Sequence, residues 1–111
     1  LLLLGIAYKK DISDIRESPA VKVAEILKRK GTNLSYHDPF VPKIKIDGET
    51  LYSMNLNTKV IHSSDITIIL TAHSNINYKM IHKEAKVVLD TCNILRDFPL
   101  RSRESAEIYR L

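Results

Sequence analysis

Residues 1–20 read LLLLGIAYKKDISDIRESPA, and this stretch decides the fold. The apolar run Leu1–Leu4 is continuous, which is typical of a parallel strand that is buried on both faces. Gly5 closes the run, and glycine suits a position where the backbone turns or approaches another segment closely. A charged loop then leads to Ser18 and Pro19, where helical spacing begins. The stretch therefore predicts the first strand, loop and helix of a βαβ unit.

The predicted helix is marked at both ends. Ser18 is placed to cap its first turn, and Pro19 suits the first helical position because an N–H there would lack a helical partner. Its apolar stripe consists of Ala20, Val23, Ala24 and Leu27. Gly31 predicts the left-handed residue that ends the helix, so we expect the helix to span residues 19–30.

The rest of the chain continues the alternation of strands and helices. We expect further strands at residues 33–37, 66–70 and 86–90, and helices at residues 56–62 and 75–84. This order predicts an α/β fold: a three-layer, Rossmann-like parallel sheet with helices on both faces.

Two segments lie outside this pattern. Asp47 and Gly48 predict a hairpin turn between residues 44–46 and 50–52. We assign residues 1–95 to one domain and residues 96–111 to a charged tail, partly helical near residues 104–111.

Length and composition restrict the class of protein. The 111 residues suffice for one domain with a modest core, and 44% hydrophobic with 27% charged residues is ordinary for a globular chain. The longest apolar run is much too short to cross a membrane. No signal peptide is visible, and the chain opens without Met, so we expect a piece of a longer protein. The single cysteine, Cys92, excludes an internal disulfide and a thiolate zinc site and fits a cytoplasmic location.

The net charge of +4 is spread over the chain, apart from basic clusters at residues 28–30 and 101–103. A solvated surface explains such clusters more simply than a nucleic-acid site does. We therefore expect neither nucleic acid nor a membrane as a partner. A mild positive charge also suits a ligand that carries a pyrophosphate.

Three loops follow the three most apolar strands, at residues 6–18, 71–75 and 91–94. Because the carboxyl ends of parallel strands meet at one edge, and ligands of open α/β sheets bind there, we expect these loops to line one crevice.

The first loop carries charges of both signs. Lys9 and Lys10 can contact a phosphate as point charges, and Arg16 can contact it through two N–H groups. The alternative left open by the charge pattern is that Asp11, Asp14 and Glu17 pair with these cations across a surface loop.

A direct dinucleotide site is a weaker interpretation of the same stretch. The fingerprint of such sites needs three glycines, and here only Gly5 is present. Asp38 does end the second predicted strand, where an acid that binds ribose would stand. His73 follows the strand at residues 66–70, and a lone histidine there is more often a hydrogen-bonded loop residue than a base. The other histidines show no spacing typical of zinc ligands, so we expect no metal site.

The run from Leu4 to Ala20 resembles the C-terminal, UDP-binding domain of the UDP-glucose/GDP-mannose dehydrogenase family, most closely the bacterial UDP-N-acetylglucosamine and UDP-N-acetylmannosamine 6-dehydrogenases. The family run reads L-G-x-A-Y-K-x-D-x-x-D-x-R-E-S-P-A, and each fixed letter occurs here. The resemblance implies part of an NAD-dependent oxidoreductase that converts the C6 alcohol of a UDP-sugar to a carboxylate.

The resemblance also implies roles for individual residues. Tyr8 and Lys9 match the aromatic–lysine pair that contacts the UDP-sugar, and Arg16 matches the arginine that reaches the NAD site of the neighbouring domain. Residues 90–93, DTCN, resemble the family's D-T-R-N, so Cys92 stands in the substrate site in place of arginine. The second loop, TAHS, resembles T-D-H-S with Ala72 in place of an acid.

The family's catalytic cysteine belongs to a central domain that this chain lacks, so we expect the chain to bind UDP-sugar rather than to catalyse. Its expected partners are the N-terminal and central domains of the same enzyme, which is expected to be a homo-oligomer. The alternatives are a stand-alone nucleotide-binding or regulatory module and a nucleic-acid-binding domain.

Overall fold

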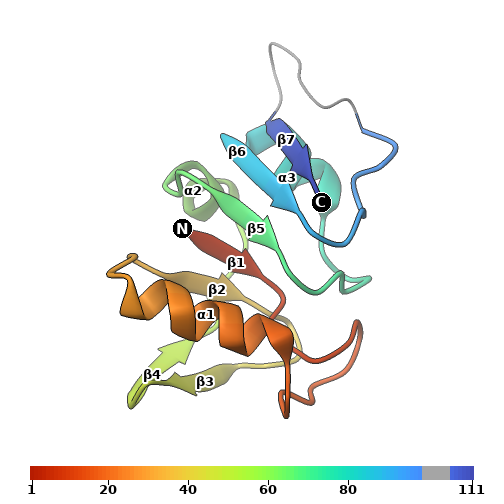
Figure 1. Ribbon diagram of the computed structural model, residues 1–111. Helices are drawn as coiled ribbons and strands as arrows, with labels where there is room; N and C mark the ends of the chain where they lie inside the picture. Colours follow the sequence, from red (N-terminus) through yellow and green to blue (C-terminus); the bar gives the residue numbers. More distant parts are fainter. Residues whose placement is uncertain (99–105) are drawn as a thin grey trace.

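The computed structural model describes residues 1–98 and 106–111, and its centre is a five-stranded sheet in the order β2–β1–β5–β6–β7 (Figure 1). These strands are β1 (Leu2–Leu4), β2 (Ser35–His37), β5 (Thr67–Ile69), β6 (Val87–Asp90) and β7 (Glu107–Arg110). Every pair of neighbours is parallel. The helices are α1 (Pro19–Arg29), α2 (Thr58–His62) and α3 (Tyr78–Glu84), and β3 (Lys43–Ile46) with β4 (Glu49–Tyr52) forms a separate antiparallel hairpin.

Alternating side chains of β1 divide the core into two halves. Leu2 and Leu4 belong to one apolar cluster, to which α2 and α3 contribute Ile61 and Ile81. Leu3 belongs to the other cluster, which contains the small residues of α1 and the apolar side of the hairpin. Helices therefore lie on both faces, and the expected three-layer α/β fold is confirmed.

The turns follow their local sequence, with one exception. Asp47 and Gly48 have φ values of 48° and 82°, the left-handed pair that a tight hairpin turn needs. Gly31, at φ 82°, ends α1 as expected. Ser18 occupies the cap position of α1, but its hydroxyl makes no capping bond and donates to the carbonyl oxygen of Ile6 at 2.8 Å. Ser18 therefore ties the helix start to the end of β1.

The predicted tail contributes a strand. Residues 107–110 form β7, which pairs with β6, so the expected helix near residues 104–111 is wrong for these residues. Ala106 and Ile108 are buried, which anchors the strand on the α2–α3 side. The sheet thus continues beyond residue 95, and the strand at 86–90 is not the last. The basic cluster at residues 101–103 lies outside the described residues.

The basic end of α1 is paired with acids of the hairpin. Lys28 contacts Glu49, and Arg29 donates from Nε and Nη2 to the two carboxylate oxygens of Asp47, each at 3.0 Å. These bonds lower the pKa of Asp47. Lys28 and Arg29 therefore fasten the hairpin to α1.

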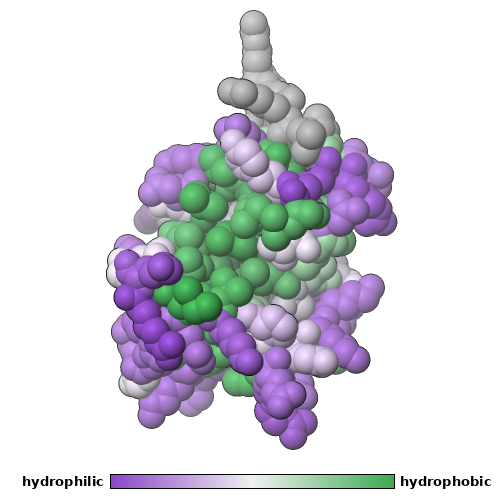
Figure 2. All heavy atoms as spheres, viewed as in Figure 1, coloured by the Kyte–Doolittle hydropathy of each residue, from purple (hydrophilic) through white to green (hydrophobic). Residues whose placement is uncertain are grey.

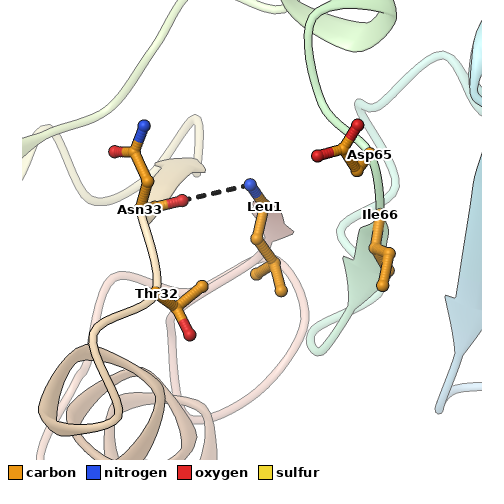
Figure 3. A pocket seen from close by; sticks show the side chains of 5 residues that line it. All are labelled: Leu1, Thr32, Asn33, Asp65 and Ile66. Atoms are coloured by element: carbon orange, nitrogen blue, oxygen red, sulfur yellow. Dashed lines mark hydrogen bonds between the residues drawn. The ribbon is translucent and has the colours of Figure 1, made fainter.

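Figure 2 shows hydrophobic side chains gathered over the sheet and hydrophilic ones around it. Among the described helices, none has the length and apolar character that a membrane crossing requires. A cavity of about 240 Å³ lies at the amino ends of β1 and β5 (Figure 3). It is lined by Leu1, Thr32, Asn33, Asp65 and Ile66. It lies at the edge of the sheet opposite to the three predicted loops.

Candidate functional site

The first and second loops meet at the point where the strand order reverses. From β1 the chain goes to β2 on one side of it and later returns to β5 on the other. Ligands of doubly wound sheets bind at such a point, beyond the carboxyl ends of the strands. Thr71 donates its hydroxyl to the carbonyl oxygen of Ala7 at 2.8 Å. A Cβ at Gly5 would clash with the backbone of Thr71, so the close approach of the loops needs a glycine there.

Asp38, at the end of β2, fixes the start of the first loop. Its Oδ2 accepts the N–H groups of Ile6 at 2.8 Å and Ala7 at 3.1 Å, and its Oδ1 accepts that of Phe40 at 2.8 Å. The carboxylate is buried, so these hydrogen bonds take the place of those that water would donate to its charged oxygens. Asp38 therefore serves the backbone and does not stand free for a ribose.

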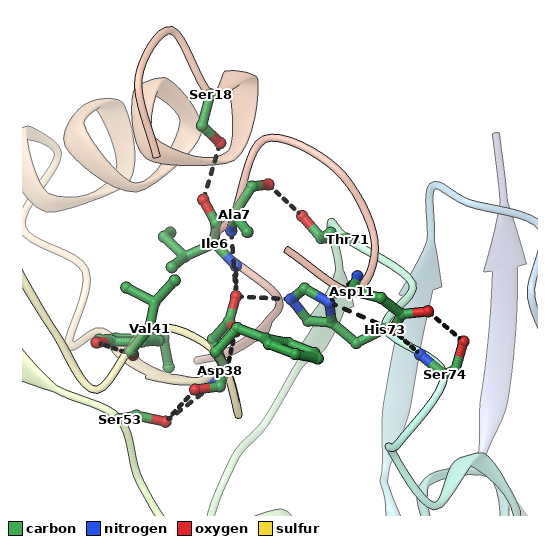
Figure 4. Close-up of polar contacts among 12 residues, drawn as sticks. Ile6, Ala7, Asp11, Ser18, Asp38, Val41, Ser53, Thr71, His73 and Ser74 are labelled. Carbon is green, nitrogen blue, oxygen red and sulfur yellow. Dashed lines mark hydrogen bonds and ion pairs between the residues drawn. The ribbon is translucent and has the colours of Figure 1, made fainter. Parts of the chain in front are cut away.

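His73 connects Asp38 to the middle of the first loop (Figure 4). Its Nε2 lies 2.9 Å from Oδ2 of Asp38, and its Nδ1 accepts the N–H of Asp11 at 2.7 Å. Because Nδ1 is an acceptor, the ring proton of the neutral imidazole belongs on Nε2, where it is donated to Asp38. The side chain is fully buried. The expectation of a hydrogen-bonded loop histidine is confirmed.

Asp11 completes the hydrogen-bonded connection between the first two loops. We call this connection, made by Asp38, His73, Asp11 and Ser74, the clasp. Its backbone has a φ of 61°, in the left-handed region, and its carboxylate accepts the N–H of Ser74 at 2.7 Å and the hydroxyl of Ser74 at 2.5 Å. These bonds lower the pKa of Asp11. Asp11 therefore bonds the second loop instead of the neighbouring lysines.

The residues between the two held ends of the first loop project from the fold. Ile6 and Ala7 are held by Asp38, and Asp11 is held by the second loop, so residues 8–10 form an exposed tip. Tyr8 is 47% exposed, and Nζ of Lys9 lies 5.7 Å from the centroid of its ring, within cation–π range. An aromatic ring and an ammonium group are thus presented together from a fixed base.

Arg16 lies further along the same loop, beside Tyr8. Its guanidinium donates to both carboxylate oxygens of Asp14 at 3.1 Å, yet its side chain is 88% exposed. The pair lowers the pKa of Asp14. Tyr8, Asp14, Arg16 and Glu17 line an open cavity of about 390 Å³. Asp14 therefore pairs with a cation of its own loop, which is the alternative left open by the charge pattern. The guanidinium of Arg16 nevertheless remains accessible to solvent.

The third loop is organised by Asp90. Its carboxylate accepts the N–H groups of Cys92 at 3.1 Å, Ile94 at 3.2 Å and Leu95 at 2.8 Å. Cys92 is partly buried, with its Sγ 3.7 Å from the hydroxyl of Thr91, and burial raises the pKa of its thiol. A raised pKa reduces the thiolate fraction, which is the reverse of what a nucleophile needs. No cluster of three metal-ligating side chains occurs within residues 1–98 and 106–111.

Tyr78, at the start of α3, contacts the second loop, and this contact was not predicted from the sequence. Its hydroxyl donates to the carbonyl oxygen of His73 at 2.8 Å. Burial raises its pKa, and Cys92, Asp11 and Asp90 add to the effect. Tyr78 therefore ties the start of α3 to the second loop, and the parallel order of β1, β5 and β6 confirms that the three loops lie at one edge. A tyrosine three residues after the second loop is the signal that could have suggested it.

The residues present do not form a dinucleotide site of their own. The space beside Gly5, where a pyrophosphate would need to approach, is filled by Thr71. The acid that would bind ribose, Asp38, is occupied by three N–H groups and His73. The weaker interpretation of the first loop is thus disfavoured.

Known proteins match almost the whole chain. Residues 2–97 match the model of the UDP-glucose/GDP-mannose dehydrogenase family, UDP binding domain. The UDP-N-acetyl-D-mannosamine dehydrogenase of Methanocaldococcus jannaschii is 30% identical over 119 residues, which cover 98% of this chain and 26% of that protein. The UDP-glucose 6-dehydrogenase of Rickettsia bellii is 31% identical over 104 residues, or 86% of this chain and 24% of that protein.

Solved structures agree with these matches. The UDP-D-ManNAc dehydrogenase from Pyrococcus horikoshii superposes with a TM-score of 0.71 at 26% identity, over 98% of this chain and 24% of that one. The UDP-N-acetyl-mannosamine dehydrogenase of Staphylococcus aureus superposes with a TM-score of 0.70 at 27% identity, over 98% of this chain and 25% of that one. This chain thus spans about a quarter of the length of these relatives.

Proposed function

Because this chain belongs to the UDP-glucose/GDP-mannose dehydrogenase family, as its UDP-binding domain, we propose that it binds the UDP-sugar substrate of an NAD-dependent UDP-sugar 6-dehydrogenase. The parent enzyme would oxidise the C6 alcohol of a UDP-hexose or UDP-N-acetylhexosamine to the uronate. The remaining three quarters of the relatives' length would supply the NAD-binding and catalytic parts.

The observation that carries the proposal is the clasped tip of the first loop. Tyr8 and Lys9 project from anchors that are bonded to β2 and to the second loop. An aromatic face suits a uracil or ribose ring, and an ammonium group suits a pyrophosphate oxygen. A tip held in place before binding has less conformational entropy to lose when the ligand arrives.

Two further residues complete the proposed site. Arg16, with its exposed guanidinium, would extend from this domain towards NAD held by another part of the enzyme, where NAD accepts the hydride. Cys92 would line the substrate site from the third loop. A thiol cannot supply the charge of the arginine that the family carries there, so Lys9 would provide more of the positive charge on that side.

The complete enzyme is proposed to be a cytoplasmic homo-oligomer that makes uronates for polysaccharide biosynthesis. The low cysteine content of these 111 residues supports a reducing compartment.

NADH production measured at 340 nm tests the proposed reaction. The polypeptide encoded by the complete reading frame should reduce NAD when a UDP-sugar is added, and the 111-residue chain alone should not. Turnover by the 111-residue chain, or NAD reduction by the complete polypeptide that is independent of any UDP-sugar, would contradict the proposal.

A further inference from the structure

One row of side chains crosses the sheet from a buried to a half-exposed position. The parallel register aligns Leu3 with Ile68, Ile68 with Leu89, and Leu89 with Tyr109. Aligned residues of neighbouring strands point to the same face of a sheet, so all four lie on the face that carries α1. Leu3 is 0% exposed, Ile68 is 8% exposed and Tyr109 is 52% exposed. The cover over this face is therefore lost from β1 towards β7.

The same loss of cover is visible along β5. Ile66 and Leu70 stand two residues from Ile68 on either side and so point to the same face, and Ile66 is 40% exposed. In Figure 1, β5, β6 and β7 face the viewer without a helix in front of them, and Figure 2 shows hydrophobic side chains over this area. We call the partly exposed residues Ile66, Leu70, Leu89 and Tyr109, which surround the buried Ile68, the open face.

Chain topology explains why the open face lacks a helix. Helices α2 and α3 pack on the opposite face, against Leu4 and Val88. The connection from β6 to β7 also contributes to that opposite cluster, through Leu95 and Phe98. Helix α1 is already used to cover Leu3. The described part of the chain therefore holds no further element for the open face.

An open parallel sheet is an incomplete structure. Parallel sheets occur almost always with both faces covered by helices, because their strands are apolar on both sides. From β5 to β7 there are two strand spacings, or about 10 Å, which matches the diameter of one helix. Ile66 also lines the cavity beside Leu1, so the open face continues into a hollow that side chains of a covering helix can enter (Figure 3).

We propose that the open face binds one amphipathic helix from a part of the same polypeptide that lies outside these 111 residues. The proposal rests on the proposed function, under which this chain is one domain of a longer enzyme. The relatives have about three quarters of their length outside the matched region, which is ample to supply such a helix. A second copy of this chain would instead place one parallel sheet against another, without the helical cover that such sheets normally have.

Hydroxyl-radical footprinting of tyrosine side chains tests the proposal. The 111-residue chain is compared with the polypeptide of the complete reading frame. Tyr109 should be modified several-fold more slowly in the complete polypeptide. Tyr52 on β4, which is 67% exposed and remote from the open face, is the matched control and should react equally in both.

A charged substitution gives a second, independent readout. Ile66→Lys should lower the Tm of the complete polypeptide by several degrees and leave that of the 111-residue chain nearly unchanged. Met54→Lys is the control, because Met54 is 42% exposed and lies outside the open face. It should change neither Tm.

Four results would overturn the proposal. Tyr109 could react equally in both proteins, or Ile66→Lys could leave the complete polypeptide as stable as Met54→Lys does. Tyr109 could become protected as the 111-residue chain is concentrated, which would identify a second copy as the occupant. The reading frame could also prove to encode no further residues. UDP binding by the 111-residue chain is measured separately and reports on the proposed function alone, since the crevice lies at another edge.

Discussion

Nε2 of His73 lies 2.9 Å from Oδ2 of Asp38, and both side chains are fully buried although 35 residues separate them. Asp38 ends β2 and His73 follows β5, so the pair joins the carboxyl ends of strands on either side of β1. The same carboxylate oxygen also accepts two N–H groups at the start of the first loop. The position of the proposed ligand tip therefore depends on one buried hydrogen-bond network.

Asp38→Ala is expected to destabilise the fold strongly. The change leaves three backbone N–H groups and the imidazole without their acceptor in a buried site, and each unsatisfied donor costs about 1–3 kcal/mol. We expect a loss of at least about 3 kcal/mol in the free energy of unfolding, measured with urea. Asp65→Ala is the control, because the side chain of Asp65 is 95% exposed and it should cost little. Equal stability of the two variants would show that the network is not formed.

Two substitutions of His73 separate its two bonds. His73→Gln retains a donor for Asp38 and loses the acceptor for the Asp11 N–H, whereas His73→Asn can retain that acceptor and loses the donor. Hydrogen exchange measured by NMR should therefore show a fast Asp11 amide in His73→Gln and a slower one in His73→Asn. In urea unfolding, His73→Gln should be the more stable of the two variants, because it retains the bond to Asp38. The same Asp11 exchange rate in both variants would refute the assignment of Nδ1 as acceptor.

Asp11 makes loop stability dependent on pH in the acid range. Its folded pKa lies below the ordinary value of 3.8 because Ser74 donates to the carboxylate. The unfolded chain thus binds the proton first as pH falls, so the stabilisation is complete above pH 3.8 and is lost as pH falls through the lowered pKa. The difference in unfolding free energy between wild type and Asp11→Asn should therefore shrink between pH 5 and pH 2. A difference that is constant over this range would contradict the lowered pKa.

Much of the fold could be predicted because its signals are local. The apolar run Leu1–Leu4 predicted a buried parallel strand, and the backbone preferences of Asp47 and Gly48 predicted the hairpin. Strand β7 was missed because charged residues surround it and its apolar content is small. Its signal was the alternation of Ala106 and Ile108, which point inward, with the polar Glu107 between them.

The candidate site could be predicted only to the level of its loops. All three loops were expected at one edge because they follow parallel strands, and that expectation needs no side-chain detail. The bonds of Asp38 to Ile6, Ala7 and His73 could not be found this way, because these residues lie more than 30 positions away in the sequence. Ser18 illustrates the same limit: its sequence context favours a cap, but the nearby carbonyl of Ile6 takes its hydroxyl.

Cys92 is expected to react slowly and to be shielded by ligand. Burial raises the pKa of its thiol above 9.0, so iodoacetamide at pH 8 should alkylate it much more slowly in the native chain than in urea. If Cys92 lines the substrate site, UDP-sugar should slow the native reaction further, and ATP at the same concentration serves as the control nucleotide. A native rate equal to the rate in urea would contradict the buried thiol, and an alkylation rate unaffected by saturating UDP-sugar would remove Cys92 from the site.

The central claim is that the clasped loop tip binds UDP-sugar through Lys9, and calorimetric titration of UDP tests it most directly. A charge-assisted hydrogen bond to a pyrophosphate oxygen is worth about 1.5–3 kcal/mol, so Lys9→Ala should weaken UDP binding roughly tenfold or more. Lys10→Ala is the matched control, since it removes the same charge one residue away and should have a much smaller effect. Two results would contradict the claim. Lys9→Ala could bind UDP as tightly as the wild type while Lys10→Ala loses binding, or the wild-type chain could fail to bind UDP.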